Sequence, residues 1–249
     1  MIKFIWPIYL ILLQKVNSTN QYARKYILKN INWLIIWSLN QNKGIGIGNN
    51  LWYTEKEKNL TFSIIFKPIN PFYNKYIINI ITSNAIHKVL SKKNKKIFWI
   101  KWPNDIILFG KKIGGILIEN SLFLKKIHTS IIGIGLNVYQ TKFDKKWNAS
   151  SLKEILNINI ELDDLFYKII FFIQKEYLLF IKYGENFIKK YYINHLYLKD
   201  KISIFYIYKT KNFIKGIIRS ITNQGFLIIE FNNKFYFFSQ KEIKFIINK

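Results

Sequence analysis

Residues 101–120, with the sequence KWPNDIILFGKKIGGILIEN, contain the side chains of this chain that are best suited to chemistry. Pro103 must interrupt strand pairing because it has no backbone donor, so the Pro-Asn-Asp sequence is expected to form a corner. This corner predicts that Lys101, Asn104 and Asp105 lie together at the end of a strand. A lysine fixed at such a point can offset negative charge on bound anions.

Apolar runs before and after the corner predict strands at residues 97–100, 106–109 and 113–118. Residues 110–112, Gly-Lys-Lys, are typical of a turn between the second and the third of these strands. Gly114 and Gly115 lie in the third strand, where the lack of a side chain would let a ligand or another backbone approach closely.

Two further motifs precede this segment. Ser18, Thr19 and Asn20 come directly before a helical pattern at 21–28, so one of the three is expected to cap that helix. Their two hydroxyls and one amide also suit a small ring that both donates and accepts hydrogen bonds. Residues 41–52 contain three glycines at every second position, and this spacing predicts a mobile loop whose backbone can approach a ligand.

The order of these motifs resembles that of the biotin–protein ligases. Lys-Trp-Pro-Asn-Asp followed by Gly-Gly-Ile-Leu-Ile-Glu is similar to the central motif of that family, and Gly-Ile-Gly-Leu-Asn-Val at 133–138 is similar to a later one. The resemblance covers almost the whole chain. It implies that biotin and ATP are substrates, with Mg²⁺ held mainly by phosphates. It also implies transfer of biotin from biotinyl-adenylate to a lysine of a biotin carboxyl carrier protein.

The resemblance implies a role for each matching residue. Lys101 is the expected catalytic group, because it could bridge the biotin carboxylate and the α-phosphate and offset their repulsion. Biotin is expected to contact Ser18, Thr19, Asn20, Gln41, Gly44, Gly46, Lys101, Gly114 and Gly115. The adenylate or ATP is expected to contact Ile45, Ile47, Trp52, Asn104 and Asn137. No residue is assigned as a direct metal ligand, although Asp105 could contribute to holding the ion.

The loop departs from the family pattern where arginine would be expected. Ile45 stands at a position that is usually arginine, and Ile47 and Asn50 stand at positions that are arginine in many relatives. Arginine there would neutralise phosphate oxygens, which isoleucine cannot do. The isoleucines could instead form an apolar lid, and nearby lysines could supply charge: Lys43, Lys56 or Lys58. We therefore expect slower chemistry or a leakier intermediate, and the same reaction.

Composition excludes several other classes. The 249 residues are 50% hydrophobic and 18% aromatic, which allows a sizeable core. The absence of cysteine excludes disulfides and thiolate chemistry, and the three histidines have no ligand spacing. The net charge of +25 comes almost entirely from lysine, since only Arg24 and Arg219 are arginine. A- and T-rich codons explain this excess, and nucleic-acid binders use arginine for bidentate contacts, so we expect no nucleic-acid partner.

The N-terminal residues 2–13 are apolar apart from Lys3. They are too short to span a bilayer and are not followed by a small-residue cleavage site, so we predict a buried first strand, no membrane association and a cytoplasmic protein. Ser18 lies too close to the start to leave room for the N-terminal helix-turn-helix that part of the family carries. We therefore expect a form of the ligase without the repressor role.

We predict an α+β fold with two domains. Residues 1–197 would form a mixed β-sheet flanked by helices, which is the class II synthetase-like fold of the biotin and lipoate ligases. Further strands are expected at 32–39, 59–66 and 129–134, helices at 72–90, 150–154, 161–182 and 187–197, and a basic turn at 91–96. Period-two patterns predict a small SH3-like barrel over residues 198–249, with strands at 202–205, 213–218, 225–230 and 234–238.

Two other functions stay open at this point. A protein that binds biotin but has lost adenylation would follow from the missing arginines at Ile45 and Ile47. A lipoate–protein ligase would share the catalytic fold, although the Lys-Trp-Pro-Asn-Asp and Ser-Thr-Asn motifs argue against it. The sequence leaves open which carrier is modified and whether the chain is a monomer or a homodimer.

Overall fold

The computed structural model describes residues 2–92, 97–144 and 146–246. The strands are β1 (Tyr9–Leu13), β2 (Leu34–Ser38), β3 (Gly44–Ile45), β4 (Leu51–Trp52), β5 (Asn59–Phe66), β6 (Phe98–Lys101), β7 (Asp105–Leu108), β8 (Lys111–Phe123), β9 (Lys126–Asn137), β10 (Ile202–Ile207), β11 (Asn212–Ile221), β12 (Leu227–Phe231), β13 (Lys234–Phe238) and β14 (Ile243–Ile246). The α-helices are α1 (Thr19–Ala23), α2 (Ile77–Leu90), α3 (Leu152–Leu156), α4 (Leu162–Tyr183) and α5 (Glu185–Asn194), and the 3₁₀ helices are η1 (Arg24–Tyr26) and η2 (Ile47–Asn49).

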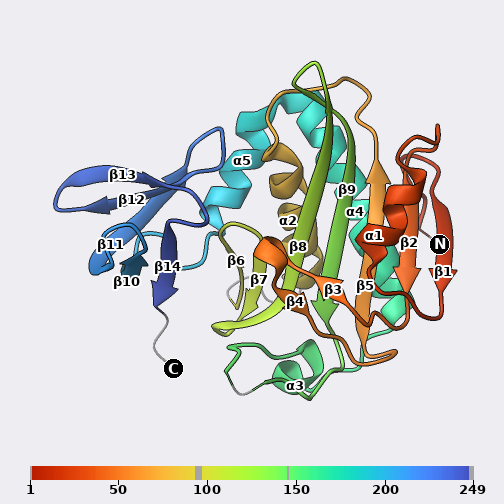
Figure 1. Ribbon diagram of the computed structural model, residues 1–249, viewed down its shortest axis with the longest axis horizontal. Coiled ribbons are helices and arrows are strands. Elements are labelled where there is room, and N and C mark those ends of the chain that lie inside the picture. Colours follow the sequence, from red (N-terminus) through yellow and green to blue (C-terminus); the bar gives the residue numbers. More distant parts are fainter. Residues whose placement is uncertain (1, 93–96, 145, 247–249) are drawn as a thin grey trace.

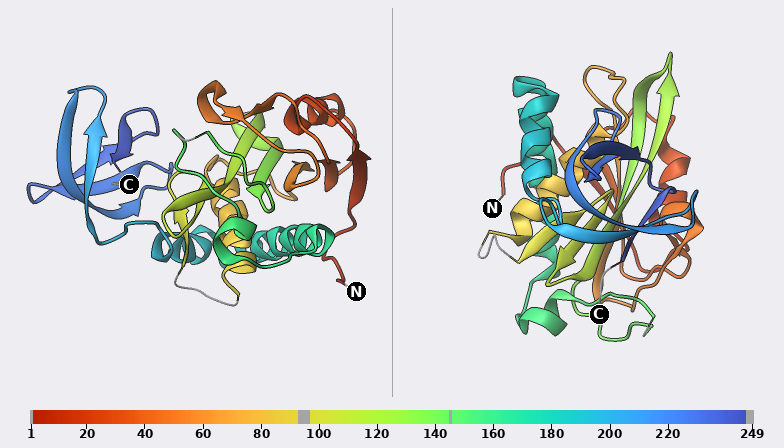
Figure 2. Two further views of the ribbon diagram at one scale, coloured as in Figure 1. Left: turned by 90° about the horizontal axis from the view of Figure 1, so that it is seen from below. Right: turned by 90° about the vertical axis from the view of Figure 1, so that its left-hand side faces the viewer.

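Seven strands form one mixed sheet in the order β1-β2-β5-β9-β8-β7-β6. β1 is parallel to β2, and the other neighbouring strands are antiparallel. Helices α2, α4 and α5 pack against one another and cover one face of the sheet, whereas the short β3–β4 hairpin lies on the other side (Figures 1 and 2). The main hydrophobic core lies between the sheet and these helices. The predicted mixed sheet flanked by helices is therefore confirmed.

The N-terminal strand differs from the prediction. The apolar segment 2–13 forms a strand only over Tyr9–Leu13, and Tyr9 and Leu12 are 56% and 51% exposed. The reason is its position: β1 is the edge of the sheet and pairs only with β2, so one side of the strand is uncovered. The prediction of a strand is confirmed, and the prediction that it is buried is wrong. No helix in the described parts of the chain combines the length and the apolar character that crossing a membrane requires.

The turn after the Pro-Asn-Asp corner also differs from the prediction. It is centred on Phe109 and Gly110, which have positive φ angles of 46° and 80°. Lys111 and Lys112 therefore begin strand β8 and are not turn residues. Of the basic turn expected at 91–96, residues 93–96 lie outside the described part of the chain.

The C-terminal segment forms a separate antiparallel sheet in the order β13-β12-β11-β10-β14. Four of these strands match the predicted ones, and β14 is an addition. The pairings among the described residues run in an open order, so closure into a barrel stays a prediction. Figure 1 shows this sheet in blue beside the main one, with β14 nearest to it. Trp102 fixes the contact, since its Nε1 donates to the Gly225 carbonyl at 2.8 Å.

Candidate active site

The strand register aligns five residues in one row across the main sheet. Lys101 of β6 pairs with Asp105 of β7, Asp105 with Gly115 of β8, Gly115 with Gly135 of β9, and Gly135 with Thr61 of β5. Directly paired residues point to the same face of a sheet, and here this is the face opposite helices α2, α4 and α5, on which α1 also packs. The two glycines in the middle of the row leave a trough between the charged pair and the threonine.

This row forms the floor of a cavity of about 420 Å³, a size typical of ligand sites. Its walls come from three other parts of the chain: the Ser18–Thr19–Asn20 triplet, the β3–β4 hairpin, and the C-terminal sheet. The C-terminal residues that line it are Tyr208, Gln240, Ile243, Lys244 and Phe245. Both sheets therefore contribute to one site.

One end of the cavity is lined by neutral side chains, and a buried serine, Ser63, supports them from behind without lining the cavity. We call this group the neutral end: Ser18, Thr19, Asn20, Gln41 and Ser63. Ser18 caps α1 by accepting a hydrogen bond from the Gln21 backbone, as predicted for this triplet. The Thr19 backbone donates to Gln41 Oε1 at 2.9 Å, and the Thr19 hydroxyl lies 3.2 Å from the same oxygen. Because these groups are buried and hydrogen-bonded to one another, their positions are set before any ligand binds.

Asn20 and Ser63 complete the neutral end. The Ser63 hydroxyl lies 2.6 Å from Asn20 Oδ1 and 2.8 Å from Thr19 Oγ1. The Asn20 amide donates to Glu119 at 3.0 Å. Gly133 lies directly beneath Asn20, and a Cβ on this glycine would come within 2.2 Å of Asn20 Oδ1. Glycine is therefore required here, since any larger residue would displace the asparagine.

The predicted glycine loop forms a short hairpin over the cavity. Gly44 packs tightly inside it, because a Cβ there would meet Gln41 at 2.3 Å and the Trp52 carbonyl at 2.5 Å. Ile45 and Ile47 line the cavity, so the residues that replace the expected arginines do face the site. Trp52 lies over Gly135, where a Cβ would come within 2.3 Å of its ring. The hairpin thus places an indole and two aliphatic side chains above the row.

The opposite end, which we call the charged end, consists of Lys101, Asp105 and Lys112. Lys112 Nζ forms an ion pair with Asp105 Oδ1 at 2.7 Å. Lys101 Nζ lies 5.1 Å from the centre of the Phe245 ring, which comes from β14. Burial lowers the pKa of Lys101 most strongly, the nearby Asp105 opposes this, and the like charge of Lys112 lowers the pKa further. The Lys101 ammonium is therefore placed where it can bind anionic groups in the cavity.

The corner between β6 and β7 is fixed by several hydrogen bonds. The Pro103 carbonyl accepts from Tyr76 at 2.8 Å, from Asn79 at 2.6 Å and from Tyr192 at 2.9 Å. The Asn104 side chain donates to the Ile116 carbonyl of β8. Since α2 and α5 supply three of these donors, the helices behind the sheet hold the end of the strand that carries Lys101.

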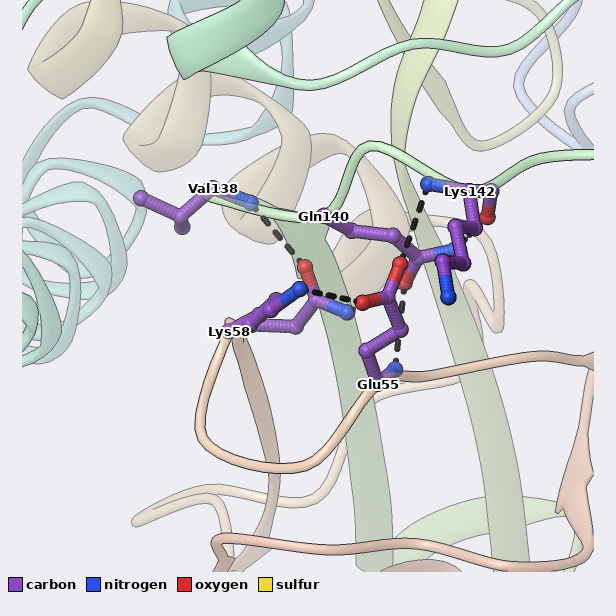
Figure 3. A network of polar contacts seen from close by, with 6 residues as sticks. Glu55, Lys58, Val138, Gln140 and Lys142 are labelled. Carbon is purple, nitrogen blue, oxygen red and sulfur yellow. Dashed lines mark hydrogen bonds and ion pairs between the residues drawn. The ribbon is translucent and has the colours of Figure 1, made fainter.

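The segment after the hairpin is anchored by a polar network around Glu55 (Figure 3). The Glu55 carboxylate accepts from Lys58 Nζ and, at 3.0 Å, from the Lys142 backbone. The hydrogen bond from Lys58 is the main cause that lowers the pKa of Glu55. Gln140 Oε1 accepts from the Glu55 backbone at 3.3 Å and from the Asn59 amide. The network ties the exit of the hairpin to the ends of β5 and β9.

The structure brings most of the predicted site residues together at this cavity. Those that line it are Ser18, Thr19, Asn20, Gln41, Ile45, Gly46, Ile47, Trp52, Lys101, Asn104 and Gly115. Three others do not: Gly44 packs inside the hairpin, Gly114 faces Leu136 and Ile106 on the core side, and Asn137 is buried and donates to the Ser150 carbonyl at 3.1 Å. The contacts with a ligand that are expected of all these residues stay predictions.

Several cavity residues were missed in the sequence. Thr61, Lys112 and Gly133 lie in strands whose register cannot be read from a single sequence. Phe245, in the C-terminal sheet, lies more than 100 residues after the last recognised motif. Alternation in β5 gave one available signal, since Asn59, Thr61 and Ser63 are polar residues at every second position of this strand.

The sequence matches the biotin/lipoate A/B protein ligase family over residues 12–137, which is just over half of the chain. The chain belongs to this family. Among curated relatives, it is 28% identical over 153 residues to the bifunctional ligase/repressor BirA of Bacillus subtilis, covering 60% of this chain and 47% of that protein. It is 33% identical over 103 residues to the chloroplastic biotin–protein ligase 1 of Arabidopsis thaliana, covering 39% of this chain and 28% of that protein. The chain thus spans less than half the length of these two relatives.

The fold is also that of a solved biotin protein ligase. The structure of the Aquifex aeolicus enzyme in complex with biotin and ATP superposes with a TM-score of 0.80, at 21% identity, over 96% of this chain and 99% of that one. The alignment extends over both sheets, so the shared fold includes the C-terminal part as well as the family segment at 12–137.

Proposed function

We propose that this chain is an ATP-dependent biotin–protein ligase that activates biotin as biotinyl-5′-adenylate and transfers it to a specific lysine of a biotin carboxyl carrier protein. The observation that carries the proposal is the cavity itself, which has a neutral hydrogen-bonding end and a charged end joined by a glycine trough. The family match and the curated relatives support it. Residues 1–197 would be the catalytic domain and residues 198–249 a second domain that closes the site.

The two ends suit the two parts of biotin. The hydroxyls of Ser18 and Thr19 and the amide of Asn20 line this end and can donate to and accept from a ureido ring, whereas Ser63 holds Thr19 and Asn20 from behind. The apolar tail would lie between the two ends, beside the Trp52 ring that packs over Gly135, and the carboxylate would then point toward the charged end. A neutral end is appropriate for an uncharged ring, because a charge buried there without a partner would be costly.

Activation requires two anions to meet. An oxygen of the biotin carboxylate attacks the α-phosphorus of ATP, the bond from that phosphorus to the bridging oxygen breaks, and pyrophosphate leaves. Lys101 can contact both groups and offset their repulsion, because it is fixed at the strand end beside the trough. Trp52 and Asn104 line the cavity where a nucleotide would lie.

Transfer then needs no covalent enzyme intermediate. The neutral amine of the carrier lysine attacks the acyl carbon of the adenylate, an amide bond forms, AMP leaves and one proton is released. The chain would act by holding the mixed anhydride and excluding water, with Ile45 and Ile47 above it as an apolar cover.

A magnesium ion is expected with ATP, and the cavity offers few side chains that would hold it. Among the described residues, no three side chains of His, Cys, Asp or Glu gather as a metal cluster. Asp105 and Asn104 line the cavity with Lys101 and carry side-chain oxygens, and Asp105 already pairs with Lys112. The ion would therefore be held chiefly by phosphate oxygens, and it would supply charge neutralisation.

The test is biotin-dependent exchange of labelled pyrophosphate into ATP. We expect the wild-type chain to exchange, and we expect Lys101→Ala to lower the rate about 100- to 1,000-fold, as removal of a group that stabilises transition-state charge does in other enzymes. Biotin affinity, measured by calorimetry, should change far less, because the ring contacts at the neutral end remain. Lys111→Ala is the matched control, since Lys111 is an exposed lysine of β8, two strands away in the same sheet.

Other outcomes would replace the proposal. A wild-type chain that binds biotin without exchange would be a biotin-binding protein that has lost adenylation. If Ile45→Arg then restored exchange, the missing arginine would be the cause. Exchange that depends on lipoate and not on biotin would identify a lipoate ligase.

A further inference from the structure

Lys112 reaches the cavity only because of a β-bulge. Ile106 pairs with Gly114 but Ile107 pairs with Lys112, so Ile113 has no partner on β7. In a regular strand, Lys112 and Gly115 would point to opposite faces because three positions separate them. The extra residue changes this: Ile113 is fully buried in the core, and Gly114 also faces core side chains.

The bulge therefore turns the Lys112 side chain to the face that carries Gly115. A Cβ on Gly115 would lie 3.4 Å from Lys112 Nζ, and the same Nζ lies 5.6 Å from the centre of the Trp52 ring. The backbone of Lys112 is fixed on its other side, where its N–H donates to the Asn148 carbonyl at 2.9 Å and its carbonyl accepts from Ser150 at 3.0 Å.

The lysines expected to replace the missing loop arginines lie elsewhere. Lys43 is exposed, Lys56 pairs with Glu57 at 3.3 Å, and the Lys58 ammonium is engaged by Glu55. These three are absent from the cavity wall, which among the described lysines includes Lys101, Lys112 and Lys244. Lys244 is exposed on β14, whereas Lys112 is held in place by Asp105 and is close enough to Lys101 to lower its pKa.

We propose that Lys112 is a phosphate-binding residue that supplies, from the floor of the site, the positive charge that Ile45 and Ile47 cannot supply from the loop. This inference rests on the proposed function. Its ammonium has three donors, of which Asp105 uses one, so two remain for the phosphate oxygens of a nucleotide. Asp105 opposes the lowering of the Lys101 pKa and pairs with Lys112, so it holds the two lysines close together before the nucleotide arrives. Lys101 and Lys112 then bind oxygens from two sides.

The experiment measures pyrophosphate exchange against ATP concentration at saturating biotin. We expect Lys112→Met to lower kcat/KM for ATP about 10- to 100-fold, the effect of removing a charge-assisted hydrogen bond. Lys112→Arg should keep most of the activity, because it keeps the charge. Lys111→Met is the control, since it removes an adjacent, exposed lysine from the same strand and should leave kcat/KM unchanged. Biotin affinity without nucleotide should be the same in all four proteins.

A second substitution tests whether Lys112 acts through its positive charge or by supporting neighbouring side chains. Adding Ile45→Arg to Lys112→Met should restore exchange, because the loop would then supply the missing positive charge. Exchange by Lys112→Met equal to wild type would overturn the inference. So would a loss that Ile45→Arg does not restore, or one matched by an equal loss of biotin affinity, because Lys112 would then act by supporting Trp52. Absence of exchange in the wild-type chain would instead remove the proposed function, so the two failures are separable.

Discussion

At one end of the cavity, neutral side chains from α1, β5 and Gln41 hydrogen-bond to one another, and at the other end three charged side chains from β6, β7 and β8 face a common space. The side chains of the neutral end are held in place by hydrogen bonds to one another. The charged end depends on repulsion and attraction among Lys101, Asp105 and Lys112, which a ligand would change. The neutral end can therefore be rigid without a ligand. At the charged end, an anionic ligand would offset the repulsion between the two lysines.

The largest expected effect comes from closing the space under the neutral end. Gly133→Ala would place a Cβ 2.2 Å from Asn20 Oδ1 and 2.9 Å from its Cγ, so Asn20 would have to move. We expect biotin affinity to fall about 100-fold or more, since the asparagine would lose its own partners as well as its contact with the ligand. Calorimetry would measure this, and thermal unfolding would check that the protein remains folded.

A double variant provides the control for this prediction. In Asn20→Ala, the side chain that obstructs position 133 is gone, so adding Gly133→Ala should cost little further affinity. Non-additivity of this kind is the signature of two residues in direct contact. Biotin affinity equal to wild type in Gly133→Ala alone would contradict the placement of Asn20 over this glycine.

The difference between the two ends also explains what the sequence could predict. The neutral triplet is contiguous, so Ser18, Thr19 and Asn20 were identified together from local signals and from the resemblance. Lys101 was likewise found beside its own corner. Lys112 was placed in a turn, because the Gly-Lys-Lys pattern is typical of one. The structure moves the turn back to Phe109 and Gly110 and adds a bulge that reverses the face of the lysine.

Long-range placement accounts for the remaining differences. Phe245 belongs to a strand that was not predicted, and it reaches the site because Trp102 bonds to Gly225 and holds the C-terminal sheet beside the corner. The first strand was predicted to be buried because it is apolar, but exposure depends on whether a neighbouring strand covers it. Strand register, bulges and sheet edges depend on tertiary contacts, so a single sequence does not predict them. The strands themselves were largely predicted, because their periodicity is a local property of the sequence.

A smaller effect is expected from removing the hydroxyl that links the members of the neutral end. Ser63→Ala takes away the group that lies 2.6 Å from Asn20 Oδ1 and 2.8 Å from Thr19 Oγ1. Loss of one such hydrogen bond costs about 1–3 kcal/mol when a buried partner is left unsatisfied, so biotin affinity should fall about 10-fold. The exchange rate at saturating biotin should stay close to wild type, because the charged end is intact.

Ser130→Ala is the matched control for this change. Like Ser63, Ser130 is fully buried and does not line the cavity, but its hydroxyl donates to Asn120 at 2.6 Å and not to a residue of the neutral end. It should lower thermal stability by an amount similar to Ser63→Ala while leaving biotin affinity unchanged. An equal loss of affinity in both variants would indicate a general loosening of the sheet and would remove the specific role of Ser63.

The smallest expected effect is a difference in pH dependence between the charged end and the neutral end. Because the pKa of Lys101 is lowered, its charge is lost at a lower pH than that of an exposed lysine, and exchange should decline as the pH rises through that range. Affinity for biotin methyl ester, which keeps the ring and lacks the carboxylate charge, should stay nearly constant because the neutral end does not titrate. In Lys112→Met the alkaline decline should move to higher pH, since removing a neighbouring positive charge raises the pKa of Lys101. A decline that stays at the same pH in this variant would mean that Lys112 does not act on Lys101, and the charged end would then be two independent lysines.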